Sequence, residues 1–247
     1  MNIKQYLDST YLKTAEQAGI SPQENENIVK AFVQEAIEEK FKLVMIRPDM
    51  VLMAKQMISA AHSKVDVGTV IDFPQGKSDL IVKLEQASLA INDGADDLDF
   101  VCNYEAFKAG NIDLVKNEIL LCTKLGLDNR KVVKWIIEVA ALNPQQIVQL
   151  STLIKKVIMT NFKEEQYPMV FVKSSTGFYK TENDLPNGAT TESIIMMLEN
   201  AFPLPVKAAG GVRTYDEAVE MIRLGVKRIG TSAAKAIAHG HSSVSNY

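Results

Sequence analysis

Two lysines lie in short apolar runs where charged side chains are unusual. Lys173 follows the apolar residues 170–172, and Lys207 follows Pro205 and Val206. A lysine in a buried strand must find an anionic partner or lose its proton. Once neutral, its amine is a nucleophile that can attack a carbonyl carbon and form a Schiff base. A second ammonium group nearby favours the loss of this proton, so the two lysines together indicate carbonyl chemistry.

Carboxylates occur in two other predicted strands. Asp97 and Asp99 are two residues apart, so their side chains share one face of a strand. We expect Asp99 to act as general acid and base beside an ammonium group, and we interpret Asp97 as structural. Lys134 and Glu138 also share a face, and their pairing would be either structural or catalytic. The alternative for the whole set is that Lys173 and Lys207 do no more than neutralise these carboxylates.

Glycine-rich turns follow the last two predicted strands. Gly210 and Gly211 follow the seventh strand, and Gly230 and Ser232 lie at the end of the eighth. Glycines allow backbone N–H groups to approach an anion, and a helix beginning near Ser232 would direct its positive end to the same place. The loops after strands seven and eight are the usual phosphate site of a (β/α)8 barrel. These turns therefore predict phosphate binding.

The elements that must position these groups alternate along the chain. Short β-branched or apolar runs predict strands at 5–9, 43–46, 67–71, 97–101, 132–138, 170–174, 206–209 and 228–231. Longer segments with helical periodicity predict helices at 25–39, 50–62, 78–92, 114–125, 144–159, 191–200 and 215–224. Alternation without hairpin signals favours a parallel sheet.

The number of strands favours a closed barrel over an open sheet. Eight strands in 247 residues suit a single α/β domain, the (β/α)8 TIM barrel. An open sheet would usually have a glycine-rich phosphate loop after its first strand, and the sequence has none there. We predict a barrel over residues 1–235 and a flexible tail over residues 236–247. In such a barrel, functional residues lie at the carboxyl ends of the strands.

Composition limits the classes of function. The chain is 47% hydrophobic and 23% charged, with a net charge of −3, and it lacks a stripe of basic and aromatic residues. A nucleic-acid module and a membrane protein are therefore not expected. The first ten residues lack a secretion signal. Cys102 and Cys122 cannot form a disulfide framework and indicate a reducing compartment, so we predict a cytoplasmic protein. His62, His239 and His241 form no ligand cluster, and we expect no metal.

The motifs resemble those of the deoxyribose-phosphate aldolase family. The resemblance rests on Lys173 within residues 171–177 and on Lys207 within residues 206–213. Further matching stretches lie at 6–10, 70–76, 94–101, 134–138 and 229–232, so that the similarity extends over nearly the whole chain. The resemblance implies a class I aldolase on a (β/α)8 barrel that uses no cofactor. It also implies a homodimer.

The resemblance implies a role for each matching residue. Lys173 would form the Schiff base, Lys207 would lower its pKa, Asp99 would be the acid and base acting through a water molecule, and Asp8 would belong to their hydrogen-bond network. The substrate phosphate would be bound by Gly177, Gly210, Gly211, Gly230 and Ser232. The expected reaction is the reversible cleavage of 2-deoxy-D-ribose 5-phosphate to acetaldehyde and D-glyceraldehyde 3-phosphate. Some members end in a tyrosine that reaches the active site, and this chain ends in Tyr247.

The chain departs from the family pattern at several positions. Val139 and Ala140 replace a threonine and a small residue, Phe178 replaces a polar residue, and Ala233 replaces a serine; Met45 also stands where cysteine is common. The first three changes remove polar groups near the expected site. One alternative is therefore a Schiff-base aldolase or transaldolase for another phosphorylated sugar. A second is a barrel that binds a sugar phosphate without catalysis, although such a protein would need no imine-forming lysine.

Overall fold

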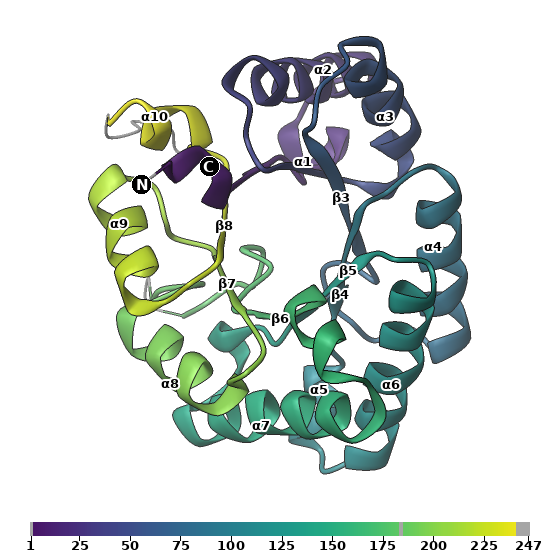
Figure 1. Ribbon diagram of the computed structural model, residues 1–247, viewed down its shortest axis with the longest axis vertical. Coiled ribbons are helices and arrows are strands. Elements are labelled where there is room, and N and C mark those ends of the chain that lie inside the picture. The colour runs from purple at the N-terminus through teal and green to yellow at the C-terminus, as the bar shows by residue number, and fades with distance from the viewer. Residues whose placement is uncertain (1, 183–184, 241–247) are drawn as a thin grey trace.

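A computed structural model describes residues 2–182 and 185–240 of the chain, whose strands form one closed barrel (Figure 1). Every strand is parallel to its neighbours, and β1 closes the barrel by pairing with β8. The strands are β1 (Leu7–Thr10), β2 (Leu43–Ile46), β3 (Asp66–Ile71), β4 (Asp97–Val101), β5 (Val132–Ile136), β6 (Val170–Lys173), β7 (Val206–Ala209) and β8 (Arg228–Thr231). The predicted (β/α)8 barrel is confirmed, and each predicted strand overlaps an observed one.

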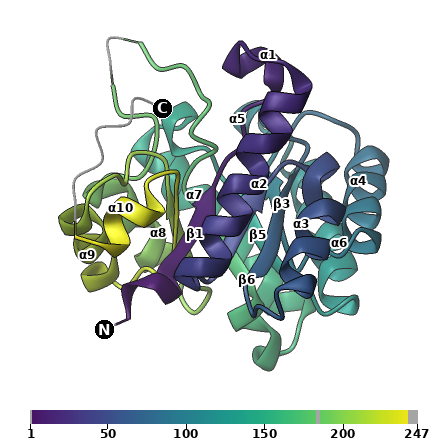
Figure 2. The same ribbon diagram turned by 90° about the horizontal axis from the view of Figure 1, so that it is seen from above.

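The helices surround the strands as an outer layer (Figures 1 and 2). In the described part of the chain they are α1 (Ala15–Ala18), α2 (Pro22–Glu39), α3 (Val51–Ala60), α4 (Leu80–Asn92), α5 (Tyr104–Lys108), α6 (Ile112–Asp128), α7 (Pro144–Asn161), α8 (Thr191–Ala201), α9 (Tyr215–Leu224) and α10 (Ala234–Ala238). The seven predicted helices overlap seven of these. The short helices α1 and α5 were not predicted, and the helix expected near Ser232 begins at Ala234.

Local capping signals fix where the long helices begin. Ser21 and Glu24 form a capping box at the start of α2, and Asn143 and Gln146 form one at the start of α7. Proline occupies the first position of both helices, where its missing N–H costs no hydrogen bond. Thr214 and Glu217 form a capping box at the start of α9. These signals explain why the predicted and observed first residues of α7 and α9 agree.

The main hydrophobic core lies between the strands and the helices. Trp135 on β5 is fully buried there, stacks on Phe100 of β4 with ring centroids 5.2 Å apart, and donates from Nε1 to Thr123 Oγ1 of α6. Burial of such apolar surface is the main free-energy source of the fold. The charged residues of the same strands must then point the other way, into the barrel, because side chains alternate along a strand.

The interior of the barrel has an apolar part and a charged part. Leu43 and Met45 of β2 pack with Val70 of β3 and Leu12 in a small apolar cluster. The charged side chains come from β1 and from β4 to β8, and they include Asp8 and Lys207, which are both fully buried. The site described below occupies this charged part.

The end of the described chain is partly helical. Helix α10 includes residues 236–238 of the predicted tail, and its Ile237 is fully buried in the core. The boundary between barrel and tail at residue 236 stays a prediction, and Tyr247 lies outside the described residues. Among those residues, no helix is long and apolar enough to cross a membrane.

Candidate active site

Strand register places charged side chains next to each other in the barrel interior. Asp99 of β4 is the register partner of Lys134 on β5, and Lys173 of β6 is the partner of Lys207 on β7. Lys207 is in turn aligned with Arg228 of β8. Because the partners lie on the same face of the sheet, all these side chains point inward. They are at least nine-tenths buried, so each charge needs a partner.

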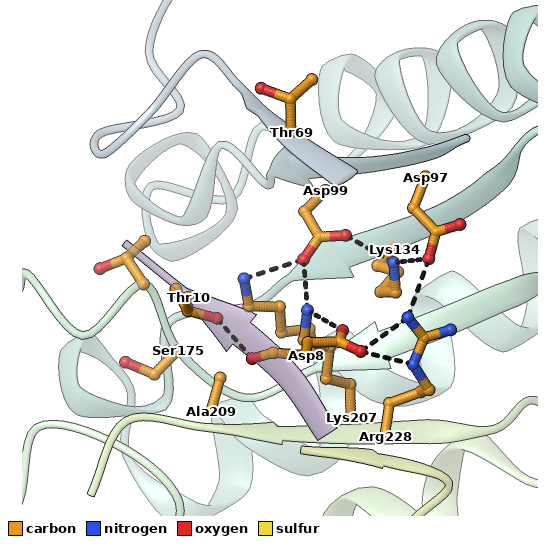
Figure 3. A network of polar contacts seen from close by, with 12 residues as sticks. Asp8, Thr10, Thr69, Asp97, Asp99, Lys134, Ser175, Lys207, Ala209 and Arg228 are labelled. Atoms are coloured by element: carbon orange, nitrogen blue, oxygen red, sulfur yellow. Dashed lines mark hydrogen bonds and ion pairs between the residues drawn. The ribbon is translucent and has the colours of Figure 1, made fainter. Parts of the chain in front are cut away.

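Asp99 is the carboxylate on which the lysines converge (Figure 3). Its Oδ2 is 2.9 Å from Lys173 Nζ and 3.0 Å from Lys207 Nζ. Its Oδ1 accepts a hydrogen bond of 2.8 Å from Lys134 Nζ. One buried carboxylate thus contacts three amino groups, two of them on the same oxygen.

Asp8 and Asp97 contact the remaining cations of the interior (Figure 3). Asp8 Oδ2 lies 2.6 Å from Lys207 Nζ, and Asp8 Oδ1 lies 2.6 Å from Arg228 Nη2. Asp97 Oδ2 lies 2.6 Å from Lys134 Nζ and 3.3 Å from Arg228 Nη2. Asp97, interpreted as structural from the sequence, therefore belongs to the same network as Asp99.

The network lowers the pKa of both Asp99 and Lys173, which favours an ionised carboxylate and a neutral amine. Burial is the main cause that lowers the pKa of Lys173; together with the positive charges of Lys207 and Lys134, and against the attraction of Asp99, it brings that pKa to about 8. Burial alone would raise the pKa of Asp99, but Lys134, Lys173 and Lys207 outweigh it and hold that pKa well below its ordinary value. Lys173 can therefore supply a neutral amine near neutral pH, while Asp99 stays ionised.

A cavity of about 120 Å³ opens at the carboxyl ends of the strands beside Lys173. Its lining includes five residues of the predicted phosphate site and several neighbours: Gly177, Gly210, Gly211, Gly230, Ser232, Thr10, Leu12, Thr176, Phe178, Asn187, Val212 and Arg213. The predicted site residues Asp8, Asp99 and Lys207 are fully buried and are not part of this lining. Asp99 contacts Lys173 and Lys207, and Lys207 contacts Asp8. Of the positions that depart from the family pattern, Phe178 is among the lining residues.

Backbone geometry explains two of the cavity glycines. Gly210 has a φ of +79°, a left-handed conformation that strains other residues, and a Cβ there would lie 2.9 Å from Gly188 Cα. A Cβ on Gly230 would lie 3.1 Å from Lys207 Cε. Both glycines therefore let the cavity wall approach its neighbours closely.

Glu138 belongs to a separate set of contacts at the cavity. It accepts hydrogen bonds from Ser175 Oγ at 2.8 Å, from the Thr176 N–H at 3.2 Å and from Thr176 Oγ1. Burial raises the pKa of Glu138, although these donors oppose the rise. The pairing of Lys134 with Glu138 that the sequence suggested does not occur, because Lys134 contacts Asp97 and Asp99 instead.

Arg228 is a residue that sequence reasoning missed. It stands at the first position of β8, where the strand pattern alone gives it no role. The signal was its spacing of two from Gly230, which places both on the inner face of the strand. Among residues 2–182 and 185–240, no group of three or more His, Cys, Asp and Glu side chains could hold a metal ion.

Residues 12–243 match the family described as DeoC/LacD family aldolase. The chain belongs to this family. This DeoC/LacD family aldolase is 36% identical over 241 residues to the deoxyribose-phosphate aldolase of Thermococcus gammatolerans, covering 97% of this chain and 96% of the relative. It is 34% identical over 248 residues to that of Streptococcus gordonii, covering 100% of both. The resemblance inferred from the motifs is confirmed.

Solved structures of aldolases are similar to this DeoC/LacD family aldolase over nearly their whole length. An aldolase named QR15 matches with a TM-score of 0.80 and 30% identity, covering 97% of this chain and 95% of that one. The deoxyribose phosphate aldolase from Aeropyrum pernix, described as having a unique tetrameric structure, matches with a TM-score of 0.76 and 26% identity, covering 96% and 89%.

Proposed function

We propose that this DeoC/LacD family aldolase reversibly cleaves 2-deoxy-D-ribose 5-phosphate to acetaldehyde and D-glyceraldehyde 3-phosphate through a Schiff base on Lys173. Relatives named deoxyribose-phosphate aldolase align with 97% to 100% of the chain. The observation that carries the proposal is the position of Lys173. Its amine stands at the cavity and shares an oxygen of Asp99 with a second ammonium group.

The reaction begins when the neutral amine of Lys173 attacks the aldehyde carbon of the open-chain sugar. The carbinolamine loses water and becomes a protonated imine, which attracts electrons from the neighbouring bonds. The hydroxyl group at C3 gives up its proton, the C2–C3 bond breaks, and its electron pair forms an enamine. D-glyceraldehyde 3-phosphate leaves. Protonation of the enamine at C2 and hydrolysis of the imine release acetaldehyde and restore Lys173.

Asp99 and Lys207 are the groups that we assign to proton transfer. Asp99 is within hydrogen-bond distance of Lys173, so a proton can pass between the carboxylate and groups attached at that nitrogen, directly or through one water molecule. Lys207 contacts both Asp99 and Asp8 and can replace a proton that Asp99 gives away. Because Asp99 has a pKa well below its ordinary value, it holds a proton only transiently.

The glycine turns of the cavity are the proposed phosphate site. Gly177, Gly210, Gly211, Gly230 and Ser232 surround it together with Arg213. Binding energy from a remote phosphate can hold the aldehyde at the reacting amine. The same lining contains Phe178, which stands where the family pattern has a polar residue. This change favours a second candidate function, a Schiff-base aldolase for a different phosphorylated sugar.

Reductive trapping tests the Schiff base directly. Incubation with acetaldehyde and cyanoborohydride should add a two-carbon group to Lys173, found by peptide mass spectrometry, because the reduced imine cannot hydrolyse. Trapping should increase as the pH rises through about 8, where Lys173 loses its proton. Lys83, which is fully buried in another part of the protein, is the internal control and should stay unmodified.

The outcome decides between the candidate functions. No adduct on Lys173, under conditions in which a known class I aldolase is labelled, would refute the mechanism. If the adduct forms, turnover of 2-deoxy-D-ribose 5-phosphate compared with other sugar phosphates identifies the substrate.

We also propose a homodimer and a cytoplasmic location. Both cysteines are free and buried, which supports a reducing compartment. One solved relative is described as tetrameric, which supports self-association of the chain.

A further inference from the structure

The six contacts around Asp8, Asp97 and Asp99 close into a ring of alternating charge (Figure 3). We call the charge ring the cycle Asp8–Arg228–Asp97–Lys134–Asp99–Lys207 and back to Asp8. Each neighbouring pair in it is separated by 2.6 to 3.3 Å. All six residues are at least nine-tenths buried, so water screens these charges poorly.

The charge ring is balanced without Lys173. It contains three carboxylates, on Asp8, Asp97 and Asp99, and three cations, on Arg228, Lys134 and Lys207. Lys173 contacts the ring only at Asp99 Oδ2, which Lys207 already occupies at 3.0 Å. A protonated Lys173 is therefore a fourth cation beside three anions. Removal of one proton from Lys173 restores the balance.

Arg228 lies on the far side of the charge ring from the reacting amine. The ring leads from Asp99 to Arg228 through Lys207 and Asp8 in one direction, and through Lys134 and Asp97 in the other. Arg228 and Asp97 are not among the residues that line the cavity in the described part of the chain, whereas Lys173 is. Any effect that they have on the reaction therefore comes from their charge and their ion pairs, and not from contact with a molecule in the cavity.

Other groups near Lys173 are the same in every variant of the charge ring. Glu138 approaches from the end of β5 and interacts electrostatically with Lys173, but it lies outside the ring and its hydrogen bonds come from Ser175 and Thr176. On the side of β2 and β3, the interior is formed by the apolar cluster of Leu43, Met45 and Val70. A substitution in the charge ring therefore changes the charge around Lys173 while these other groups stay as they are.

We propose that Arg228 and Asp97 are positioning residues that decide, through the charge ring, whether Lys173 is protonated, a role that rests on the Schiff-base chemistry proposed for Lys173. Arg228 supplies the third cation, which makes the proton on Lys173 the surplus one. Asp97 supplies the third anion, which keeps Lys134 and Arg228 charged and in place. Neither residue touches the substrate cavity.

Substitutions at the two positions should move the ionisation of Lys173 in opposite directions. Arg228→Met leaves three carboxylates with two ring cations, so Lys173 should keep its proton to higher pH. The midpoint of its titration, the pH at which half of the Lys173 amines are neutral, should rise by about one pH unit. Asp97→Asn leaves two carboxylates with three ring cations, so the midpoint should fall by about one pH unit. Loss of stability alone would not produce shifts of opposite sign.

The ionisation of Lys173 can be measured without any turnover. We would label each protein with a trace of acetic anhydride over a range of pH, since only the neutral amine reacts, and quantify acetylated Lys173 by peptide mass spectrometry against a free reference amine. About one unit below the wild-type midpoint, labelling should fall about 10-fold in Arg228→Met and rise in Asp97→Asn. Because no aldehyde is present, this result is independent of whether the protein cleaves 2-deoxy-D-ribose 5-phosphate.

Matched variants separate charge from packing. Lys83 is fully buried and paired with Glu118 at 2.8 Å, outside the barrel interior, so Lys83→Met should lower stability and leave the Lys173 midpoint unchanged. Arg228→Lys keeps the charge and should stay near the wild-type midpoint, which provides a test if Arg228→Met does not fold. The proposal would be overturned if the Lys173 midpoint stayed at the wild-type value, within experimental error, in both Arg228→Met and Asp97→Asn, or moved in the same direction in both. It would also be overturned if Arg228→Lys shifted the midpoint as much as Arg228→Met does.

Discussion

Lys207 shares an oxygen of Asp99 with Lys173, so its removal changes the charge around the reacting amine. We expect Lys207→Leu to raise the pKa of Lys173 and to lower kcat/KM near neutral pH by about 100-fold or more, with partial recovery in alkaline buffer. Steady-state kinetics over a range of pH would show this. Lys83→Leu is the control, because it removes an equally buried paired lysine away from the site. A near-wild-type rate in Lys207→Leu would exclude the role.

Single residues of the site were predictable to the extent that strand alternation reveals them. Lys173 and Lys207 stand out because each interrupts an apolar run, and the face of Asp99 follows from its spacing. The assignment of partners was not predictable, because it depends on which strands become neighbours. The sequence therefore did not show that Asp97 pairs with Lys134 or that Arg228 pairs with Asp8.

The loops after β6 and β7 are held together at a glycine contact. A Cβ on Gly188 would overlap the backbone of Gly210, and the Ala189 N–H donates to the Gly210 carbonyl at 2.9 Å. We expect Gly188→Ala to push the two loops apart and to raise KM for 2-deoxy-D-ribose 5-phosphate about tenfold, which corresponds to about 1.4 kcal/mol. The KM for unphosphorylated deoxyribose should change little, since it lacks the group that these loops are proposed to bind.

A second crowded glycine provides the control for this measurement. A Cβ on Gly126 in α6 would overlap Val133 Cγ2 on the outer side of the barrel, and neither residue lines the cavity in the described part of the chain. Gly126→Ala should therefore lower stability without a selective effect on the phosphorylated substrate. Equal KM changes for both sugars in Gly188→Ala would show that the contact does not serve the phosphate.

Element positions were predictable where the local signal was long enough. The strands could be located because β-branched and apolar runs mark them, and α7 and α9 begin at capping boxes. Helices α1 and α5 have only four and five residues, which is too short for helical periodicity to emerge. They form because tertiary contacts and caps hold them, such as the hydrogen bond from the Ala106 N–H to Asn103 Oδ1.

For the whole molecule, the contact of Asp8 with Arg228 joins the first strand to the last. Burial opposes the ionisation of Asp8, but Arg228, Lys207 and Lys134 lower its pKa below the ordinary value of 3.8. Its stabilising effect is thus fully present above that value and is lost as the pH falls through the lower pKa of the folded state. We expect Asp8→Asn to reduce the free energy of unfolding by about 3 kcal/mol near neutral pH, because it leaves buried cations without their partner.

Urea unfolding at neutral and acidic pH measures this effect. The difference between wild type and Asp8→Asn should narrow as the pH falls below about 4, because the Asp8 carboxylate gains a proton first in the unfolded chain and then, at lower pH, in the folded protein. Asp113→Asn is the control, because the Asp113 side chain is 97% exposed and its removal should change stability little at either pH. A difference that stays constant with pH would contradict the ionic role of Asp8.

The charges of the barrel interior are divided along the chain. The three carboxylates lie on β1 and β4, in the first half of the sequence, and the four cations lie on β5, β6, β7 and β8, in the second half. Each half-barrel alone would thus present a concave surface of one sign. Two identical halves would repel each other, whereas the two different halves attract. Electrostatic attraction therefore favours the association of a β1–β4 half with a β5–β8 half. This holds both for fragments of the chain and for segments exchanged between two chains.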